Sequence, residues 1–174
     1  VEDNVRITET LPLAAIQLHG HELPEEISDL KEHASCEVWK VIHLPAVESG
    51  EGMDLEAVLN RMREYTAAGT DRITIDASSV VKGERQYGGT GKTVDWDMVR
   101  KIREQTDCPL ILAGGIQPNN VIEAIRTVQP YGIDISSGVE VVKGKKDPEK
   151  VLLLVASVRS CETGDSVFRN NRVC

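Results

Sequence analysis

Short runs rich in Val, Ile and Leu recur along the chain, and a stretch with helical signals follows each one. The runs predict five strands, at Ile16–Gly20, Glu37–Leu44, Arg72–Ala77, Leu110–Ile116 and Gly132–Ser136. Strands that alternate with helices predict an α/β fold with a parallel sheet. Such helices either cover both faces of an open sheet or surround a barrel, and the pattern alone does not choose between them.

Proline and aspartate mark the predicted helix starts. Pro24 begins a helix that runs to about Ala34, Asp54 begins one that ends near Gly69, and Asp95 begins the helix Trp96–Thr106. Pro118-Asn119 begins a helix that runs to about Val128, and Asp147-Pro148 begins one that runs through about Val158. After Ser160 the periodicity ends. We therefore expect one domain over residues 1–160 and a flexible C-terminal tail over 161–174.

Polar side chains alternate with apolar ones in three of the predicted strands. The pairs are Gln17 and His19, Thr74 and Asp76, and Asp134 and Ser136. A strand buried on both faces should be almost entirely apolar, so the pairs are either satisfied core groups or one polar site. Because three strands share the pattern, we interpret them as a site at the strands' carboxyl ends, inside a barrel. Lys40 is expected to add a cation on that inner face.

Glycines follow two neighbouring strands, as Gly114-Gly115 and as Gly138 after Ser136-Ser137. They are either tight turns or loops that bring backbone amides close to an anion. Paired late loops of this kind favour a phosphate site.

The segment Gly88-Gly89-Thr90-Gly91-Lys92-Thr93 invites comparison with an ATP-binding P-loop, but Gln86 stands where that motif requires a glycine. We expect the region from Ser78 to Thr93 to act instead as a mobile lid over an anionic ligand.

Composition and net charge limit the kinds of molecule that the chain is expected to bind. The chain has 174 residues, 40% of them hydrophobic, and a formal net charge of −8, so nucleic acid and acidic membrane surfaces are poor partners. Four cysteines without a C-x-x-C pair suit a reducing compartment and predict no metal site. No signal peptide or membrane span is recognisable, so we expect a soluble, cytoplasmic protein.

Taken together, the motifs resemble the phosphoribosylanthranilate isomerase family of tryptophan biosynthesis. The similarity covers about Leu11 to Ser160. It is carried by Ile16-Gln17-Leu18-His19-Gly20, Ile75-Asp76, Tyr87-Gly88-Gly89-Thr90-Gly91-Lys92-Thr93, Leu112-Ala113-Gly114-Gly115-Ile116 and Asp134-Ile135-Ser136-Ser137-Gly138-Val139-Glu140, with Gly144, Lys146 and Asp147.

The resemblance implies a (β/α)₈ barrel that performs an Amadori rearrangement of N-(5-phosphoribosyl)anthranilate, without metal or organic cofactor. It makes Asp76 the general acid that protonates the furanose ring oxygen. It implies contacts to the substrate by Gln17, His19, Gly88, Gly89 and Asp134, and to its phosphate by Gly114, Gly115, Ser136, Ser137 and Gly138.

The chain departs from the family at its front. The family's first strand carries a Cys general base in a Lys-x-Cys-Gly segment, which this sequence lacks, and Ile16–Gly20 corresponds to the fourth strand. We therefore expect a partial barrel of about five βα units that belongs to a longer enzyme. One alternative is a non-catalytic phosphate-ligand binder or assembly subunit, with a partner chain, such as a second copy in a homo-oligomer, covering the open sheet edges. The other is a sister phosphate-binding barrel of tryptophan or histidine biosynthesis.

Overall fold

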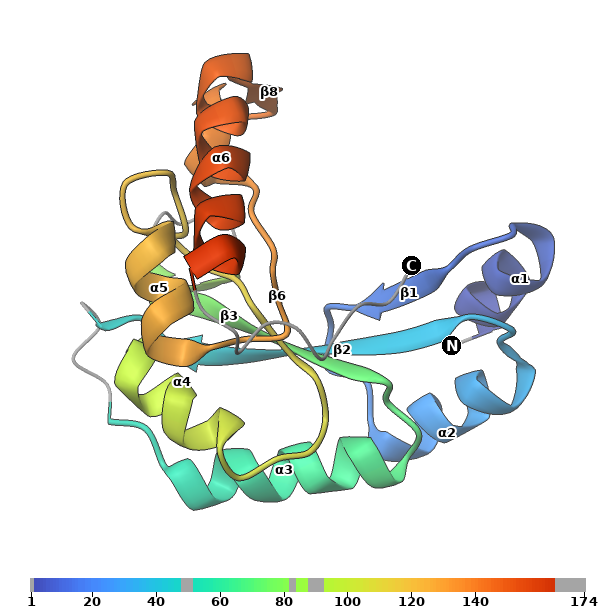
Figure 1. Cartoon of the computed structure of the whole chain (residues 1–174). Coiled ribbons are helices and arrows are strands. Elements are labelled where there is room, and N and C mark those ends of the chain that lie inside the picture. Colours follow the sequence, from blue (N-terminus) through green and yellow to red (C-terminus); the bar gives the residue numbers. More distant parts are fainter. Residues whose placement is uncertain (1, 48–51, 82–83, 88–92, 165–174) are drawn as a thin grey trace.

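A computed structural model of the chain describes residues 2–47, 52–81, 84–87 and 93–164. Five parallel strands form one sheet in the order β1-β2-β3-β5-β6, so each lies beside the next one along the chain (Figure 1). They are β1 (Ala15–Leu18), β2 (Glu37–Pro45), β3 (Arg72–Val81), β5 (Leu110–Leu112) and β6 (Gly132–Ile133). A consecutive order is that of a barrel wall, because a doubly wound sheet reverses its strand order. The predicted partial barrel is confirmed.

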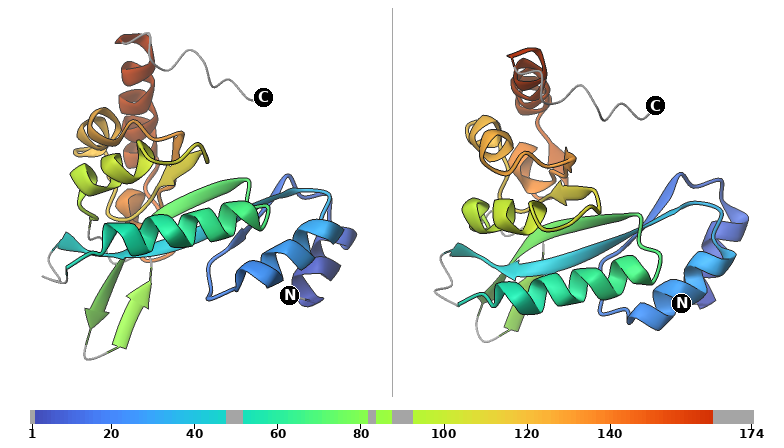
Figure 2. Two further views of the ribbon diagram at one scale, coloured as in Figure 1. Left: turned by 90° about the horizontal axis from the view of Figure 1, so that it is seen from below. Right: turned by 60° about the horizontal axis from the view of Figure 1, so that its bottom comes forward.

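Helices connect the parallel strands and begin where capping residues stand. They are α1 (Glu2–Thr10), α2 (Pro24–His33), α3 (Leu55–Ala67), α4 (Trp96–Arg103), α5 (Val121–Val128) and α6 (Pro148–Gly164). The Asp54 and Asp95 side chains accept the backbone N–H of the third residue beyond them, as expected of N-caps. Figure 2 shows α2, α3 and α4 on one side of the sheet, and each helix from α2 onward contacts the next.

The hydrophobic core lies between the sheet and these helices. Register places alternate strand residues on this face, and each is at most 5% exposed: Val38, Ile42, Ile73, Ile75, Leu110 and Leu112. Ile27 of α2, Met62 of α3 and Ile102 of α4 are buried against them. Burying each such side chain stabilises the fold by about 1.5–3 kcal/mol, so the amphipathic helices hold the sheet from this face.

The opposite face, which a barrel turns inward, carries the polar members of the strand pattern. Gln17 Nε2 donates to Thr74 Oγ1 at 3.1 Å, so the side chains from β1 and β3 meet across β2. Nearer the strands' amino ends, the Arg72 guanidinium donates twice to Glu37 and lies 4.4 Å from the Tyr131 ring centroid. This pairing lowers the pKa of Glu37 to about 2.

Lys40 does not lie on the inner face, and that prediction is wrong. Register pairs it with Leu18 and Ile73, which point to the helices, and it is 1% exposed. Its ammonium group contacts Glu22 Oε2 at 2.9 Å and lies 5.5 Å from the centre of the Tyr65 ring. Lys40 does share a face with Val38 and Ile42, as the alternation predicts, but that face packs on the helices and the polar strand residues lie on the other one.

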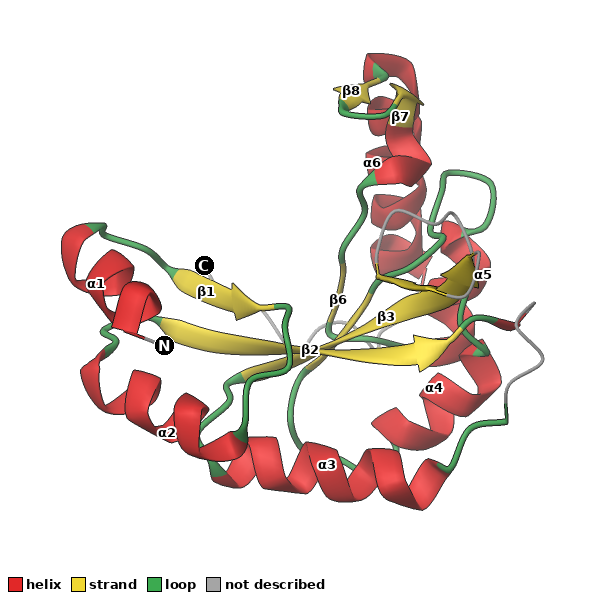
Figure 3. Ribbon diagram, turned by 180° about the vertical axis from the view of Figure 1, so that it is seen from behind, coloured by secondary structure: helices red, strands yellow, loops and turns green. Residues whose placement is uncertain are grey.

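The sheet is open among the described residues, since β1 and β6 each pair with a single neighbour. Figure 3 shows β1 beside β2, at one side of the sheet. Helix α6 exposes Leu152 and Leu153. No helix of the described ranges is both long and apolar enough to cross a bilayer.

Several local features differ from the prediction. Strand β3 continues to Val81 and forms an antiparallel hairpin with β4 (Glu84–Tyr87), within the segment expected to be a lid. The glycines of that lid, which carried the P-loop comparison, lie outside the described residues. A second hairpin, β7 (Glu140–Val142) with β8 (Lys145–Lys146), was not predicted, and neither was α1.

The ends of some elements also shift. Strands β5 and β6 stop before Ile116 and Asp134, because their chain turns into loops at the carboxyl edge. Helix α6 runs to Gly164, four residues into the expected tail, and the rest of that tail lies outside the described part of the chain.

Candidate active site

The carboxyl ends of four parallel strands surround a cavity of about 250 Å³, here called the rim cavity. It is lined by His19, Asp76, Ala113, Gly114, Gly115, Ile116, Asp134, Ile135, Ser136, Ser137 and Gly138. These residues come from the ends of β1, β3, β5 and β6, as expected where parallel strands finish at one edge.

Most of the residues singled out in the sequence therefore meet in the rim cavity. Gln17 does not, because it lies one strand repeat below His19, bonded to Thr74, and lines a separate hollow on the same face. Gly88 and Gly89 are outside the described residues. Their contribution to the site stays a prediction.

Asp76 is the buried carboxyl group of the rim cavity. It is 6% exposed, and its Oδ1 accepts the N–H of Ala77 at 2.8 Å. Burial raises the pKa of Asp76 above its ordinary value, and the nearby Asp134 carboxylate raises it further. Desolvation disfavours the charged form, so this environment favours a carboxyl group that can act as a proton donor.

Gly114 allows β5 to approach Asp76 closely. Its φ is +82°, and a Cβ atom there would lie 2.6 Å from Ala77 N and 3.0 Å from Asp76 Oδ1. Any side chain would therefore collide with the acid and with the backbone that orients it. Gly115 continues the left-handed turn with φ of +64°, and the two glycines leave their backbone amides uncovered beside the cavity.

Gly138 is equally constrained, by contact between the two glycine loops. A Cβ atom at Gly138 would lie 1.8 Å from the backbone oxygen of Ile116. The loop after β6 thus packs directly on the loop after β5. This contact brings Ser137 and Gly138 to the same side of the cavity as Gly114 and Gly115.

Lys146, on the β7–β8 hairpin, supports the second glycine loop. Its Nζ donates to Ser136 O at 2.8 Å, to Ser136 Oγ at 3.3 Å and to Glu140 Oε1 at 3.0 Å. The lysine places a cation beside the serine loop in a protein of net charge −8. Sequence analysis named Lys146 only within the family resemblance.

His19 and His43 pack together at the entrance next to Asp76. Their ring centroids are 4.7 Å apart, and His19 Nε2 lies 3.7 Å from Asp76 Oδ2. Burial lowers the pKa of His43 to about 4, so its imidazole is neutral at pH 7. Sequence analysis missed His43, although its register partner on β3 is Asp76.

The cysteines of the described ranges lie away from the rim cavity. Cys36 and Cys108 precede β2 and β5, at the opposite edge of the sheet, and Cys161 is on α6. No group of three or more His, Cys, Asp or Glu side chains with metal-binding geometry is present among the described residues.

The fold and the site together define a class. A wall of consecutive parallel strands, with two glycine loops and a buried acid at its carboxyl edge, is the architecture of the phosphate-binding β/α barrels. Within that class, residues 1–157 match the family model described as N-(5'phosphoribosyl)anthranilate (PRA) isomerase. The chain belongs to that family.

Individual relatives agree with this assignment. The chain is 37% identical over 162 residues to N-(5'-phosphoribosyl)anthranilate isomerase of Methanothrix thermoacetophila, covering 93% of this chain and 69% of that protein. It is similar to the crystal structure of the enzyme from Thermotoga maritima, with a TM-score of 0.70 and 31% identity over 91% of this chain and 68% of the other. A second structure, a complex with reduced 1-(o-carboxyphenylamino)-1-deoxyribulose 5-phosphate, has a TM-score of 0.66 and 28% identity, covering 91% of this chain and 66% of the other. The chain thus spans about two thirds of the length of these relatives.

The contact between the glycine loops predicts a large effect of Gly138→Ala. The added methyl group must push the two loops apart, so we expect a loss of about 3 kcal/mol in the free energy of unfolding. Gly52→Ala is the matched control, because Gly52, like Gly138, has no positive φ, but nothing lies within 4 Å of its added Cβ. There we expect a change of less than about 0.5 kcal/mol. Urea unfolding measures both, and equal losses would contradict the loop contact.

The burial of Asp76 predicts that Asp76→Asn stabilises the chain at neutral pH. A carboxyl group whose pKa is raised by folding binds more protons in the folded state, so its contribution to stability falls as pH rises through its unfolded and then its folded pKa. Asparagine removes this loss and can still accept the Ala77 N–H. We expect a higher urea midpoint for the variant at pH 7 and a smaller difference at pH 4. An equal or lower midpoint at pH 7 would show that the carboxylate is not strained there.

Proposed function

We propose that these residues form the acid and phosphate half of a phosphoribosylanthranilate isomerase. The reaction is the Amadori rearrangement of N-(5-phosphoribosyl)anthranilate to 1-(2-carboxyphenylamino)-1-deoxyribulose 5-phosphate, in tryptophan biosynthesis. The observation that carries the proposal is the meeting of Asp76 with both glycine loops around one cavity. Family membership and the relative bound to the reduced ribulose phosphate support the same substrate class.

Asp76 acts as the general acid in this proposal. It donates its proton to the furanose ring oxygen while the bond from that oxygen to C1 breaks, and the anthranilate nitrogen supplies the electron pair that forms the C1–N double bond. Burial supports this role because it keeps the carboxyl group protonated at higher pH than usual.

The remaining polar groups of the rim cavity bind the sugar and its phosphate. The backbone amides of Gly114, Gly115, Ser137 and Gly138 hold the phosphate, while the Ser136 hydroxyl, oriented by Lys146, lies beside them. Asp134 accepts a hydrogen bond from a sugar hydroxyl. His19 lines the pocket, Gln17 lies below it on the same face, and the Gly88 and Gly89 segment closes over the substrate.

The second proton transfer, removal of the C2 proton, needs a base. The family resemblance assigns it to a Cys in a Lys-x-Cys-Gly segment, which is absent from the 174 residues. Turnover is therefore proposed for the longer protein. No metal or organic cofactor takes part, and we place the reaction in the cytoplasm, where free cysteines such as Cys36 and Cys108 persist.

A second candidate follows from the position of the cysteines. Cys36, Cys108 and Cys161 all lie away from the rim cavity, so the chain by itself presents a phosphate site without the base. In that case the chain is a non-catalytic binder of phosphorylated ligands, and pairing of two copies covers the open edges of β1 and β6. A monomer by light scattering would exclude edge pairing.

Asp76→Asn tests the enzymatic proposal in the full-length protein. We expect kcat to fall by about a hundredfold or more, because general acid catalysis contributes on that scale, while the KM changes by less than about threefold. Asp107→Asn, which changes an exposed aspartate before β5, is the matched control and should leave both constants unchanged. Anthranilate-derivative fluorescence follows turnover. A full-length wild-type protein that binds the substrate and never isomerises it would rule out the assignment.

A further inference from the structure

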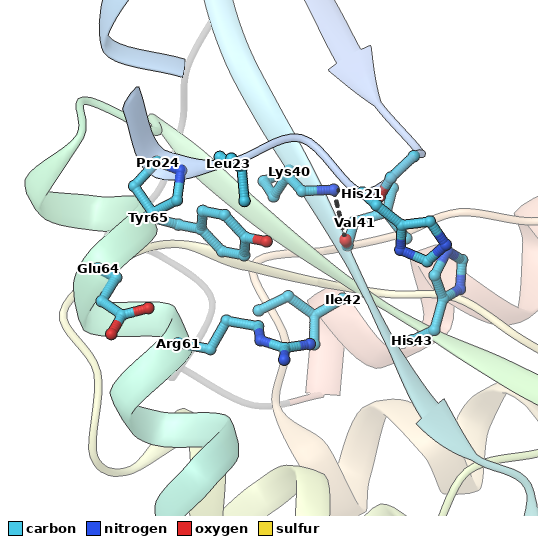
Figure 4. Close-up of a pocket in the computed structure, with 11 residues that line it drawn as sticks. His21, Leu23, Pro24, Lys40, Val41, Ile42, His43, Arg61, Glu64 and Tyr65 are labelled. Carbon is cyan, nitrogen blue, oxygen red and sulfur yellow. Dashed lines mark hydrogen bonds between the residues drawn. The ribbon is translucent and has the colours of Figure 1, made fainter. Parts of the chain in front are cut away.

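Lys40 carries a positive charge in the core, on the helix side of β2. It is 1% exposed, and its Nζ lies 2.9 Å from Gly20 O, 3.1 Å from Val41 O and 3.4 Å from Leu18 O. Glu22 Oε2 lies 2.9 Å from the same nitrogen. Figure 4 shows the ammonium group directed toward Val41, with the Tyr65 ring packed alongside the lysine. A buried charge is unfavourable unless such partners surround it, so the ammonium group and the oxygens around it hold one another in place.

The partners of Lys40 belong mainly to one loop, Leu18 to Glu22, which leaves the end of β1. Leu18 and Gly20 flank His19, so the ammonium group holds the backbone oxygens on both sides of this histidine. The far end of the loop is tied as well, because Gly20 N donates to Glu22 Oε1 at 3.2 Å and the Tyr65 hydroxyl donates to Glu22 O at 3.2 Å. The loop backbone is therefore anchored from behind the sheet.

On the other side of the same loop, the His19 side chain faces the proposed acid. The His19 side chain is 48% exposed, and its ring packs against His43 of β2, at 4.7 Å between ring centroids. Its other titratable neighbour is Asp76 of β3, at 3.7 Å. His43 Nε2 also lies 3.4 Å from His19 O, so the position of the ring depends on His43 together with the backbone that Lys40 holds on both sides of the histidine.

The cavity beside Lys40 does not explain the lysine. This hollow of about 450 Å³ is also lined by His21, Arg61, Glu64 and Tyr65 (Figure 4). The ammonium group has three N–H donors and already lies close to four oxygens, so it has no donor left for a ligand. Its role is internal to the protein.

We propose that Lys40 is a positioning residue for the active site, acting through the sheet. By holding Leu18, Gly20 and Glu22, it fixes the loop backbone that places the His19 ring beside Asp76. The catalytic consequence rests on the proposed isomerase function, whereas the position of the ring is a property of this chain.

The test measures the position of the His19 ring without turnover. Nuclear Overhauser effects between the ring protons of His19 and His43 are recorded in the 174-residue chain, where the ring centroids lie 4.7 Å apart. In Lys40→Met/Glu22→Gln, which leaves no unpaired buried charge, we expect these effects to fall below about a third of their wild-type intensity, because the loop that carries His19 loses its anchor.

Two further variants keep the test decisive. Lys31→Met/Asp71→Asn removes a lysine ion pair at the amino end of the sheet and should leave the His19–His43 effects unchanged. Glu22→Gln alone is the milder variant, to be used if the double variant does not fold, and should reduce the effects by about half. Effects at full wild-type intensity in the folded double variant, or in Glu22→Gln where only that variant folds, would overturn the proposal.

Activity gives an independent outcome in the full-length protein. Lys40→Met/Glu22→Gln should lower kcat by about tenfold, with the KM nearly unchanged because the glycine loops do not contact Lys40. A loss in KM alone would contradict the positioning role. A wild-type protein that never isomerises would refute the proposed function, while the NMR result still decides the role of Lys40.

Discussion

The close approach of β3 and β5 at Asp76 is the constraint on which the rest of the site depends. A side chain at Gly114 would lie 2.6 Å from the Ala77 nitrogen, so only glycine lets the two strands meet there. The approach buries the carboxyl group, holds it on the Ala77 N–H and raises its pKa. It also aligns the loop after β5 with the loop after β6, which touches it through Gly138. The absence of a side chain at Gly114 thus permits both the buried acid and the anion site.

The features that form the site lower the stability of the fold. Glycine at several loop positions and the buried carboxyl group of Asp76 are unfavourable for folding, and such features gather where chemistry requires them. The compensation comes from the other face of the sheet, where the helices bury Ile73, Ile75 and Leu112. The sheet is therefore stabilised from its outer face and functional at its carboxyl edge. Lys40 connects the two, because it is buried under the helices yet holds the loop that carries His19.

Period-two patterning and residue type predicted much of this fold and site. The alternation around Thr74 and Asp76 was informative because β3 is buried on its helix side, so polar residues had to face the other way. Gly114 and Gly138 were recognisable by type at the ends of strands. The contact of Gly138 with Ile116 was not, because it joins residues from different loops. Lys40 was assigned to the inner face because a charged side chain is rarely buried against helices, although it alternates in phase with Val38 and Ile42, which are. The short elements α1 and β4 were not predicted.

A titration with ribose 5-phosphate, followed by NMR, tests the central claim that the acid and the phosphate loops share one cavity. We expect the amide signals of Gly114, Gly115, Ser137 and Gly138 to shift together, with one dissociation constant. The Asp76 carboxyl signal should shift with the same constant. Saturable shifts confined to other parts of the chain, with the Asp76 signal unmoved, would contradict it.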